Sequence, residues 1–168
     1  LVADLLKTAG ATHVMSMMFH SPQVHGFFGL PTDPLSSRPV FNEYLSKRDL
    51  TGTIIVSPDM GQAKSAARFA KVLGLPVAAG NKERVSDTKV VISGLVGSQV
   101  RGHKRALIYD DEIATGGSIL ELSRVLIDEG VEDITVICTH GVFSHGGLGK
   151  LAAMPEISEV ITTDTIYL

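Results

Sequence analysis

The sequence has no tryptophan and a single cysteine, Cys138, among its 168 residues. One thiol excludes an internal disulfide framework, and its place inside the apolar segment ITVIC predicts a buried core residue rather than a nucleophile. A chain of this length buries roughly 70% of the surface that its unfolded state exposes. We therefore expect an apolar core to hold the fold, without disulfides or a structural metal.

Long apolar runs and a strong net charge are also missing. The longest apolar runs have four residues, at 106–109 and 151–154, whereas a membrane-spanning helix needs about 20. The start LVADLLKTAG has an early Asp4 and no basic lead-in to a continuous apolar stretch, so it does not read as a signal peptide. A net charge of −3 is too balanced for a dedicated nucleic-acid binder or a membrane-surface module. The expected partners are small molecules.

Short apolar segments recur along the chain and alternate with amphipathic ones. Several, such as TIIV, ALIY and TVIC, are clusters without polar alternation, which is typical of central strands in a parallel sheet covered on both faces. The sequence thus predicts an α/β fold of three layers, α/β/α, with a mainly parallel sheet. Strands are expected at 12–19, 53–57, 77–79, 89–93, 105–109, 134–139 and 160–162.

Two helices are predicted between these strands, at 61–73 and 116–129, because each segment gathers its apolar residues on one face. Gly74 and Gly130 are placed to end them. Each helix follows a strand and a short polar loop, and open parallel sheets bind ligands where such loops leave the carboxyl ends of the strands. The chemistry is expected in the loops at 57–64 and 110–118 and just after Ile137.

The segment RALIYDDEIATGGSILEL carries the strongest chemical signal. Asp110 and Asp111 end a buried strand, and TGGS at 115–118 opens a helix. Glycines let the backbone approach an anion, while helix-start N–H groups and hydroxyls donate to phosphate oxygens. No lysine follows the glycines, so this is not a Walker loop. We expect a phosphate site whose carboxylates accept sugar hydroxyls or hold Mg²⁺ through water; the alternative is an acidic surface turn.

YDDEIATGGS resembles the phosphoribosyl-diphosphate motif of type I phosphoribosyltransferases and ribose-phosphate diphosphokinases. Four further segments, FHSPQVHGFFGLP, IVSPDMGQAK, NKERVSD and THGVFSHG, match the diphosphokinases in order and spacing along essentially the whole chain. The resemblance implies a phosphoribosyltransferase-like fold and transfer of the diphosphoryl group of Mg·ATP to O1 of ribose 5-phosphate, releasing AMP. It assigns ribose 5-phosphate binding to Asp110, Asp111, Thr115, Gly116, Gly117 and Ser118.

The resemblance assigns the ATP side of the reaction to two other loops. His20 and Gln23 match positions that contact ATP phosphates, and Asp59 and Gly61 match a loop that receives the diphosphate. Mg²⁺ is the implied cofactor, with His20 and Asp59 as its implied ligands. Without the resemblance, His20 reads as a hydrogen-bonded structural histidine and Asp59 as a helix N-cap.

Lys82 and Arg84 are the expected catalytic residues. By composition, the stretch after Ala79 is a mobile surface loop with solvated charges. The resemblance implies a closing loop whose two cations stabilise charge on the transferred phosphoryl oxygens and on the leaving AMP. Ala114 departs from the family pattern, because most relatives have an aspartate there that binds ribose hydroxyls; its loss predicts weaker sugar binding or catalysis.

The family enzymes also have an N-terminal half of the same general fold. Residues 1–35 correspond to the end of that half, with its last helix, strand and connecting loop, and residues 36–168 to the catalytic domain. The resemblance thus identifies a fragment or a reduced relative, expected in the cytoplasm as a homo-oligomer, since the family is commonly hexameric. Two alternatives stay open: a regulatory, non-catalytic subunit that binds sugar phosphate, favoured by Ala114, and a type I phosphoribosyltransferase, disfavoured by NKER and HSPQVHGFF.

Overall fold

A computed structural model describes residues 1–84 and 90–167, with the side chains at 83, 84, 90 and 91 left out of the description. In chain order the elements are α1 (Val2–Thr8), β1 (Val14–Met17), the 3₁₀ helix η1 (Pro22–Phe27), β2 (Thr32–Leu35), α2 (Arg38–Leu45), β3 (Thr53–Ser57), α3 (Ala63–Leu73), β4 (Val77–Arg84), β5 (Val90–Gly97), β6 (Arg105–Ile113), α4 (Gly117–Asp128), β7 (Asp133–Gly141), the 3₁₀ helix η2 (Ser144–Gly146), α5 (Gly147–Ala152) and β8 (Ile157–Thr162).

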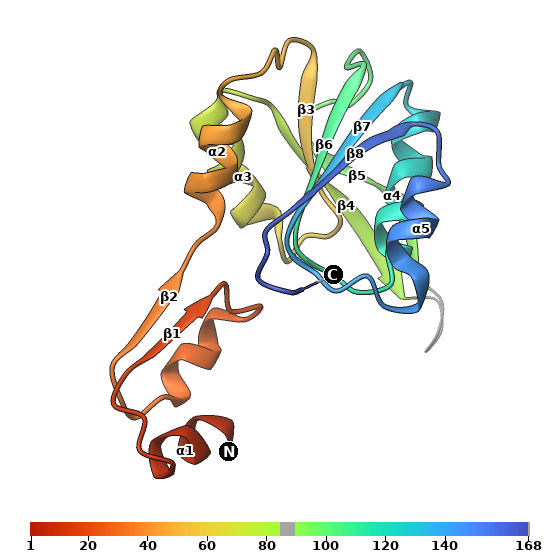
Figure 1. The fold of residues 1–168 in the computed structure, drawn as a ribbon. Coiled ribbons are helices and arrows are strands. Elements are labelled where there is room, and N and C mark those ends of the chain that lie inside the picture. Colours follow the sequence, from red (N-terminus) through yellow and green to blue (C-terminus); the bar gives the residue numbers. More distant parts are fainter. Residues whose placement is uncertain (85–89, 168) are drawn as a thin grey trace.

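The centre of the molecule is a six-stranded sheet in the order β5-β4-β3-β6-β7-β8. Neighbouring strands run parallel except β4 and β5, which are antiparallel. Helices α2 and α3 lie on one face of the sheet, and α4 and α5 lie on the other (Figure 1). The predicted three-layer arrangement with a mainly parallel sheet is confirmed.

The central strands are buried on both faces, as their unbroken apolar runs predict. Every residue of β3 is buried, and successive side chains alternate between the faces. Ile54 and Val56 pack with α4, whereas Ile55 packs with α2 and α3. Cys138 lies in the first of these cores with no exposed surface, so the prediction of a buried structural thiol is confirmed.

Glycines end the two predicted helices. Gly74 adopts the left-handed conformation (φ +68°) and closes α3, which begins at Ala63 rather than at Gly61. Gly130 (φ +95°) follows α4, and its N–H donates to the carbonyl of Ile127 at 2.9 Å. Left-handed backbone is open to glycine because it has no Cβ, so both stops follow from local sequence.

The stretch after Ala79 differs from the prediction of a surface loop. Strand β4 continues to Arg84, and Lys82 pairs with Ile92 of β5 across an antiparallel ladder. Long-range backbone pairing therefore overrides the polar composition of this stretch. Residues 85–87 of the NKERVSD segment lie outside the described residues.

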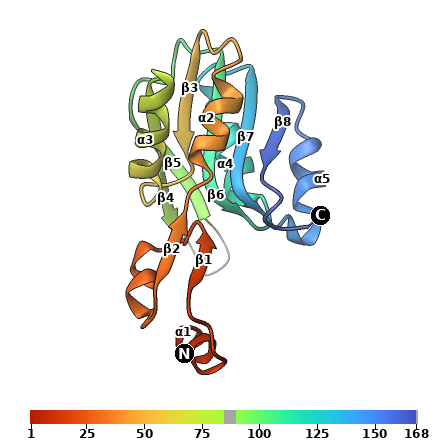
Figure 2. The same ribbon diagram turned by 60° about the vertical axis from the view of Figure 1, so that its left-hand side comes forward.

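Residues 1–35 form an N-terminal segment that projects away from the six-stranded sheet (Figures 1 and 2). Its strands β1 and β2 pair in parallel with each other, from Val14 opposite Thr32 to Met17 opposite Leu35. Strand β2 and helices α2 and α5 were not among the predicted elements. Among the described residues, no helix is both long and apolar enough to cross a membrane.

Candidate active site

The sheet topology opens a crevice between β3 and β6. These neighbours are parallel, but β3 leads into α3 on one face of the sheet and β6 leads into α4 on the other. Ligands of such sheets bind outside the carboxyl ends of the strands at the point where the connections diverge. Asp59 follows β3 and the Asp110–Asp111 pair lies near the end of β6, so the topology brings two of the three predicted loops to this crevice.

The predicted phosphate cradle is a cavity of about 190 Å³ at the start of α4. Gly116, in the left-handed conformation (φ +78°), is the N-cap, so the first N–H groups of α4 open beside it. A Cβ at Gly116 would lie 3.4 Å from the Leu151 side chain, which leaves little room for a larger residue. The cavity is lined by Lys82, Asp110, Glu112, Ile113, Ala114, Thr115, Gly116, Gly117, Ser118 and Ile119.

Lys82 reaches this cavity from the neighbouring part of the sheet. Its Nζ donates a hydrogen bond to Ser118 Oγ at 3.3 Å. A cation and a helix N-terminus thus share one cavity, and both favour an anion. The side chain of Arg84, the other predicted catalytic residue, lies outside the described part of the structure.

Asp110 and Asp111 take different roles. Asp110 lines the cradle, whereas the carboxylate of Asp111, which is nearly fully buried, bonds to His20 Nδ1 at 2.7 Å. Burial raises the pKa of Asp110 to about 8, and the adjacent Asp111 carboxyl acts in the same direction. With Nδ1 bonded to a carboxylate, His20 keeps its Nε2 lone pair for another partner, an arrangement often seen in metal-binding histidines.

The loop after β3 is organised by Asp59. Its Oδ1 accepts the N–H of Gln62 at 3.1 Å, one residue before α3 begins. A Cβ at Gly61 would lie 3.0 Å from this same oxygen, so glycine leaves room for the carboxylate. The N-cap of α3 is Gln62, so the prediction of Asp59 as the N-cap is wrong; its carboxylate instead accepts the N–H of the N-cap residue.

A second cavity, of about 650 Å³, separates the N-terminal segment from the start of α3. His20, Gln23 and Gly61, all predicted for the ATP side, line it. Sequence reasoning missed the cationic part of its wall, formed by Arg38, Lys64 and Arg68. Lys64 and Arg68 are spaced i, i+4 and so share a helix face, but nothing local connects them with Arg38.

The chain was compared with known proteins. No family model matches it. The ribose-phosphate pyrophosphokinase of Deinococcus radiodurans is 40% identical over 170 residues, a match that covers the whole chain and 52% of that enzyme. The crystal structure of phosphoribosylpyrophosphate synthetase from Mycobacterium smegmatis superposes with a TM-score of 0.86 at 34% identity, covering 99% of this chain and 53% of that one. The chain is a homologue of the ribose-phosphate pyrophosphokinases.

The chain spans about half the length of the ribose-phosphate pyrophosphokinases that it matches. The purine phosphoribosyltransferase of Pyrococcus horikoshii shares only 17% identity, with a TM-score of 0.53 over 92% of this chain and 89% of that one. That likeness concerns the fold alone. The fold is therefore of the phosphoribosyltransferase type, and the sequence similarity favours the pyrophosphokinases over the phosphoribosyltransferases, as the NKER and HSPQVHGFF segments predict.

Proposed function

We propose that this chain carries the catalytic centre of a ribose-phosphate pyrophosphokinase, which transfers the diphosphoryl group of ATP to O1 of ribose 5-phosphate and releases AMP and 5-phospho-α-D-ribose 1-diphosphate. The observation that carries the proposal is the cradle, where Lys82 meets the N-terminus of α4 beside Asp110. The cradle takes the 5-phosphate on the backbone of residues 115–118. Asp110, which lines the cradle, stands beside the sugar, and Asp111 is its neighbour in β6, bonded to His20.

ATP occupies the second cavity in this proposal. The cations Arg38, Lys64 and Arg68 attract its phosphates, and His20 and Gln23 of the N-terminal segment line the same cavity. His20 lines the second cavity and bonds Asp111, whose neighbour Asp110 lines the cradle, so in this proposal the attacking sugar hydroxyl and the phosphates meet near that bond. Lys82 and Arg84 then stabilise the charge that develops on the transferred group and on the leaving AMP.

The proposed cofactor is Mg²⁺, held by His20 and Asp59 together with ATP. Among the described residues, no three His, Cys, Asp or Glu side chains converge as a ready metal site. Mg²⁺ commonly keeps several waters and takes few protein ligands beside substrate phosphates, so a metal that enters with ATP fits this arrangement. Bound Mg²⁺ would neutralise phosphate charge, and the buried, neighbouring carboxyls of Asp110 and Asp111 favour a nearby cation.

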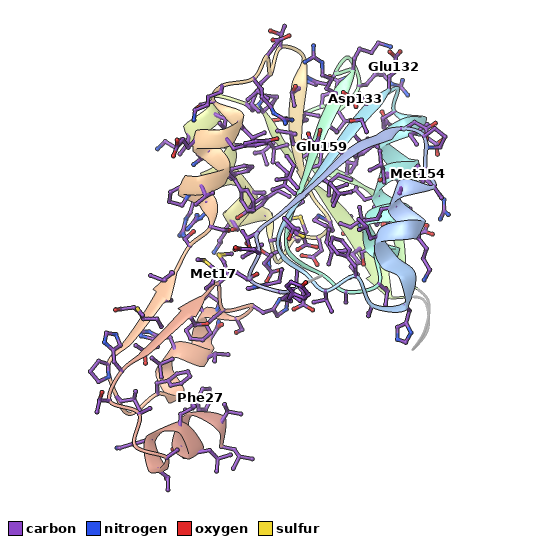
Figure 3. All side chains as sticks on the ribbon, in the orientation of Figure 1. Met17, Phe27, Glu132, Asp133, Met154 and Glu159 are labelled. Atoms are coloured by element: carbon purple, nitrogen blue, oxygen red, sulfur yellow. The ribbon has the colours of Figure 1, made fainter. Side chains whose placement is uncertain are left out.

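We propose that the N-terminal segment is the end of a further domain, residues 36–168 being the catalytic domain, and that the chain works as a cytoplasmic homo-oligomer. The segment exposes Met15 (71%) and Phe27 (74%), and Figure 3 shows Phe27 beside α1, away from the sheet. Exposed apolar side chains grouped on one segment favour burial against another protein surface. Light scattering of the purified chain tests the association, and cell fractionation tests the location.

The reaction is tested by phosphorus NMR of the chain with ribose 5-phosphate, Mg²⁺ and ATP. We expect AMP and a sugar diphosphate to appear, and Lys82→Ala to slow this about 10²- to 10³-fold, the usual cost of losing one group that stabilises transition-state charge. Lys104→Ala is the matched control, because Lys104 pairs with Glu132 at the opposite end of the sheet (Figure 3). Equal loss in both variants contradicts the proposal.

A regulatory, non-catalytic subunit is the second candidate, and Ala114 favours it because the cradle lacks the expected carboxylate. In that case ribose 5-phosphate binds the chain, its phosphorus signal shifts, and no AMP forms with ATP present. Absence of both binding and turnover removes both candidates.

A further inference from the structure

Two histidines join the N-terminal segment to the sheet. His20 bonds Asp111 of β6, and His140, at the end of β7, bonds the backbone carbonyl of Met17. Met17 is the last residue of β1 and lies at the junction between the segment and the sheet (Figure 3). The stretch from Met17 to His20 is therefore held at both ends, by the adjacent strands β7 and β6.

The ring of His140 is fixed on both sides. Its Nε2 lies 2.9 Å from the Met17 carbonyl oxygen, and its Nδ1 lies 2.9 Å from Thr165 Oγ1. A carbonyl only accepts hydrogen bonds, so Nε2 carries the proton that it donates. The Thr165 hydroxyl then sets the ring plane from the other side. His140 lies opposite Glu112 in the β6–β7 ladder, so its backbone position is set by the sheet.

The stretch between the two anchors is bent. Met18 has a left-handed backbone (φ +50°), which non-glycine residues adopt only where their surroundings hold them. Its N–H donates to the carbonyl of Leu35 at 3.0 Å, which continues the β1–β2 ladder by one bond. The bend turns the chain from β1 toward the carboxyl end of β6, where His20 meets Asp111.

Thr139, the residue before His140, contacts the connection that leads from β2 back to α2. Thr139 Oγ1 and Ser37 Oγ are 2.6 Å apart, and both side chains are buried. Consecutive residues of β7 thus anchor the chain where it leaves β1 and where it enters α2. The end of β7 therefore contacts both connections between the N-terminal segment and the rest of the chain.

We propose that His140 is a positioning residue that aligns His20 with Asp111 by holding the Met17 carbonyl. His140 touches neither the cradle nor the ATP cavity, so its effect on the reaction passes through His20. This catalytic consequence rests on the proposed function. The alignment of His20 with Asp111 does not rest on the proposed function, because it exists in the chain without substrates.

The test follows the imidazole nitrogens of His20 by NMR of the full chain labelled with ¹⁵N-histidine, with His20→Gln to assign the signal. His140→Leu removes both ring bonds, whereas His140→Gln keeps an amide donor that reaches the place of Nε2. We expect the wild-type chain and His140→Gln to show His20 with a protonated Nδ1, and His140→Leu to show the pattern of a free imidazole. The control is His103→Leu, just before the amino end of β6, where Nδ1 is buried with no hydrogen-bond partner among the described residues.

If His140→Leu does not fold, Thr165→Val replaces it. This variant keeps the ring and its Nε2 bond but removes the hydroxyl beside Nδ1, with that hydroxyl's bonds to the Thr139 carbonyl and Thr163, and it should broaden or shift the His20 signal in the same direction. An unchanged His20 pattern in folded His140→Leu or Thr165→Val overturns the inference. With turnover established, His140→Leu should lower kcat roughly 100-fold, as expected when a reacting group is misplaced by about 1 Å, and leave ribose 5-phosphate affinity unchanged. A wild-type chain that binds no ribose 5-phosphate overturns the proposed function but not the alignment of His20.

Discussion

Lys82 Nζ lies 3.3 Å from Ser118 Oγ, which places a cation from β4 against the first turn of α4. The lysine and the helix N-terminus therefore act on the same small cavity. Neither the start of α4 nor Lys82 forms a phosphate site alone, because the start of α4 has no lysine of its own and the Lys82 side chain is exposed. Their meeting is what supports a dianionic phosphate as the ligand.

Lys82→Met should weaken ribose 5-phosphate binding about 10- to 100-fold, because it removes one charge-assisted contact worth roughly 1.5–3 kcal/mol and keeps the length of the side chain. Isothermal calorimetry at low and high salt measures this loss, which salt should reduce by screening. Lys104→Met is the matched control. A similar loss in the control would mean that net charge, rather than the cradle, governs the affinity.

Gly116→Ala should destabilise the fold by about 1–2 kcal/mol, because Gly116 has φ +78° and a Cβ there meets Leu151 at 3.4 Å. It should also weaken sugar phosphate binding by moving the N-cap of α4. Gly149→Ala, where a Cβ meets nothing within 4 Å, should be neutral or stabilising. Urea unfolding of both variants gives the comparison, and equal effects would contradict the role of the left-handed N-cap.

Ala114→Asp should raise ribose 5-phosphate affinity about tenfold, equivalent to 1.4 kcal/mol, by adding to the cradle wall a carboxylate that accepts hydrogen bonds from the ribose hydroxyls. Ala114→Asn adds similar volume without charge and should give a smaller gain. Calorimetry and turnover are measured for both. If neither affinity nor turnover changes, the missing carboxylate does not limit this chain.

Asp110 should make the fold less stable as the pH rises. Because burial raises its pKa to about 8, the folded state keeps a proton that the unfolded state releases near its ordinary value of 3.8. The unfolded state thus binds fewer protons across this window, and the free energy of unfolding falls from about pH 4 toward pH 8. Asp110→Asn, which still accepts the Asp111 N–H bond observed at 2.9 Å, should flatten this part of the profile. Parallel pH profiles in urea unfolding would contradict the raised pKa.

Ser37→Ala should cost about 1–3 kcal/mol, because it leaves the buried hydroxyl of Thr139 without its 2.6 Å partner. Replacing both groups, in Ser37→Ala with Thr139→Val, should recover much of that loss, since no buried hydroxyl is then orphaned. Urea unfolding of the two single variants and the double variant forms a complete cycle. Simple additivity would show that the two side chains do not interact.

The sequence by itself determined the sheet core and the cradle. Unbroken runs such as TIIV and ALIY identify buried parallel strands, and Gly74 and Gly130 mark helix ends, because burial on two faces and left-handed backbone are local demands on residue type. The segment from Asp110 to Ser118 likewise holds its strand, turn and helix start within a few residues. Its local pattern therefore predicts a phosphate site without any long-range contact.

Only the tertiary structure decided which side chains meet. The polar stretch after Ala79 became a strand because β5 supplied its backbone partners, and this brought Lys82 to Ser118, 36 residues away. The bond between His20 and Asp111 spans 91 residues, and the bond between Met17 and His140 spans 123. Such contacts depend on strand order and on the packing of the N-terminal segment, which no periodicity within a single segment records. The physical reason is that hydrogen bonds form between groups close in space, whereas sequence patterns report only the burial and backbone preferences of each residue.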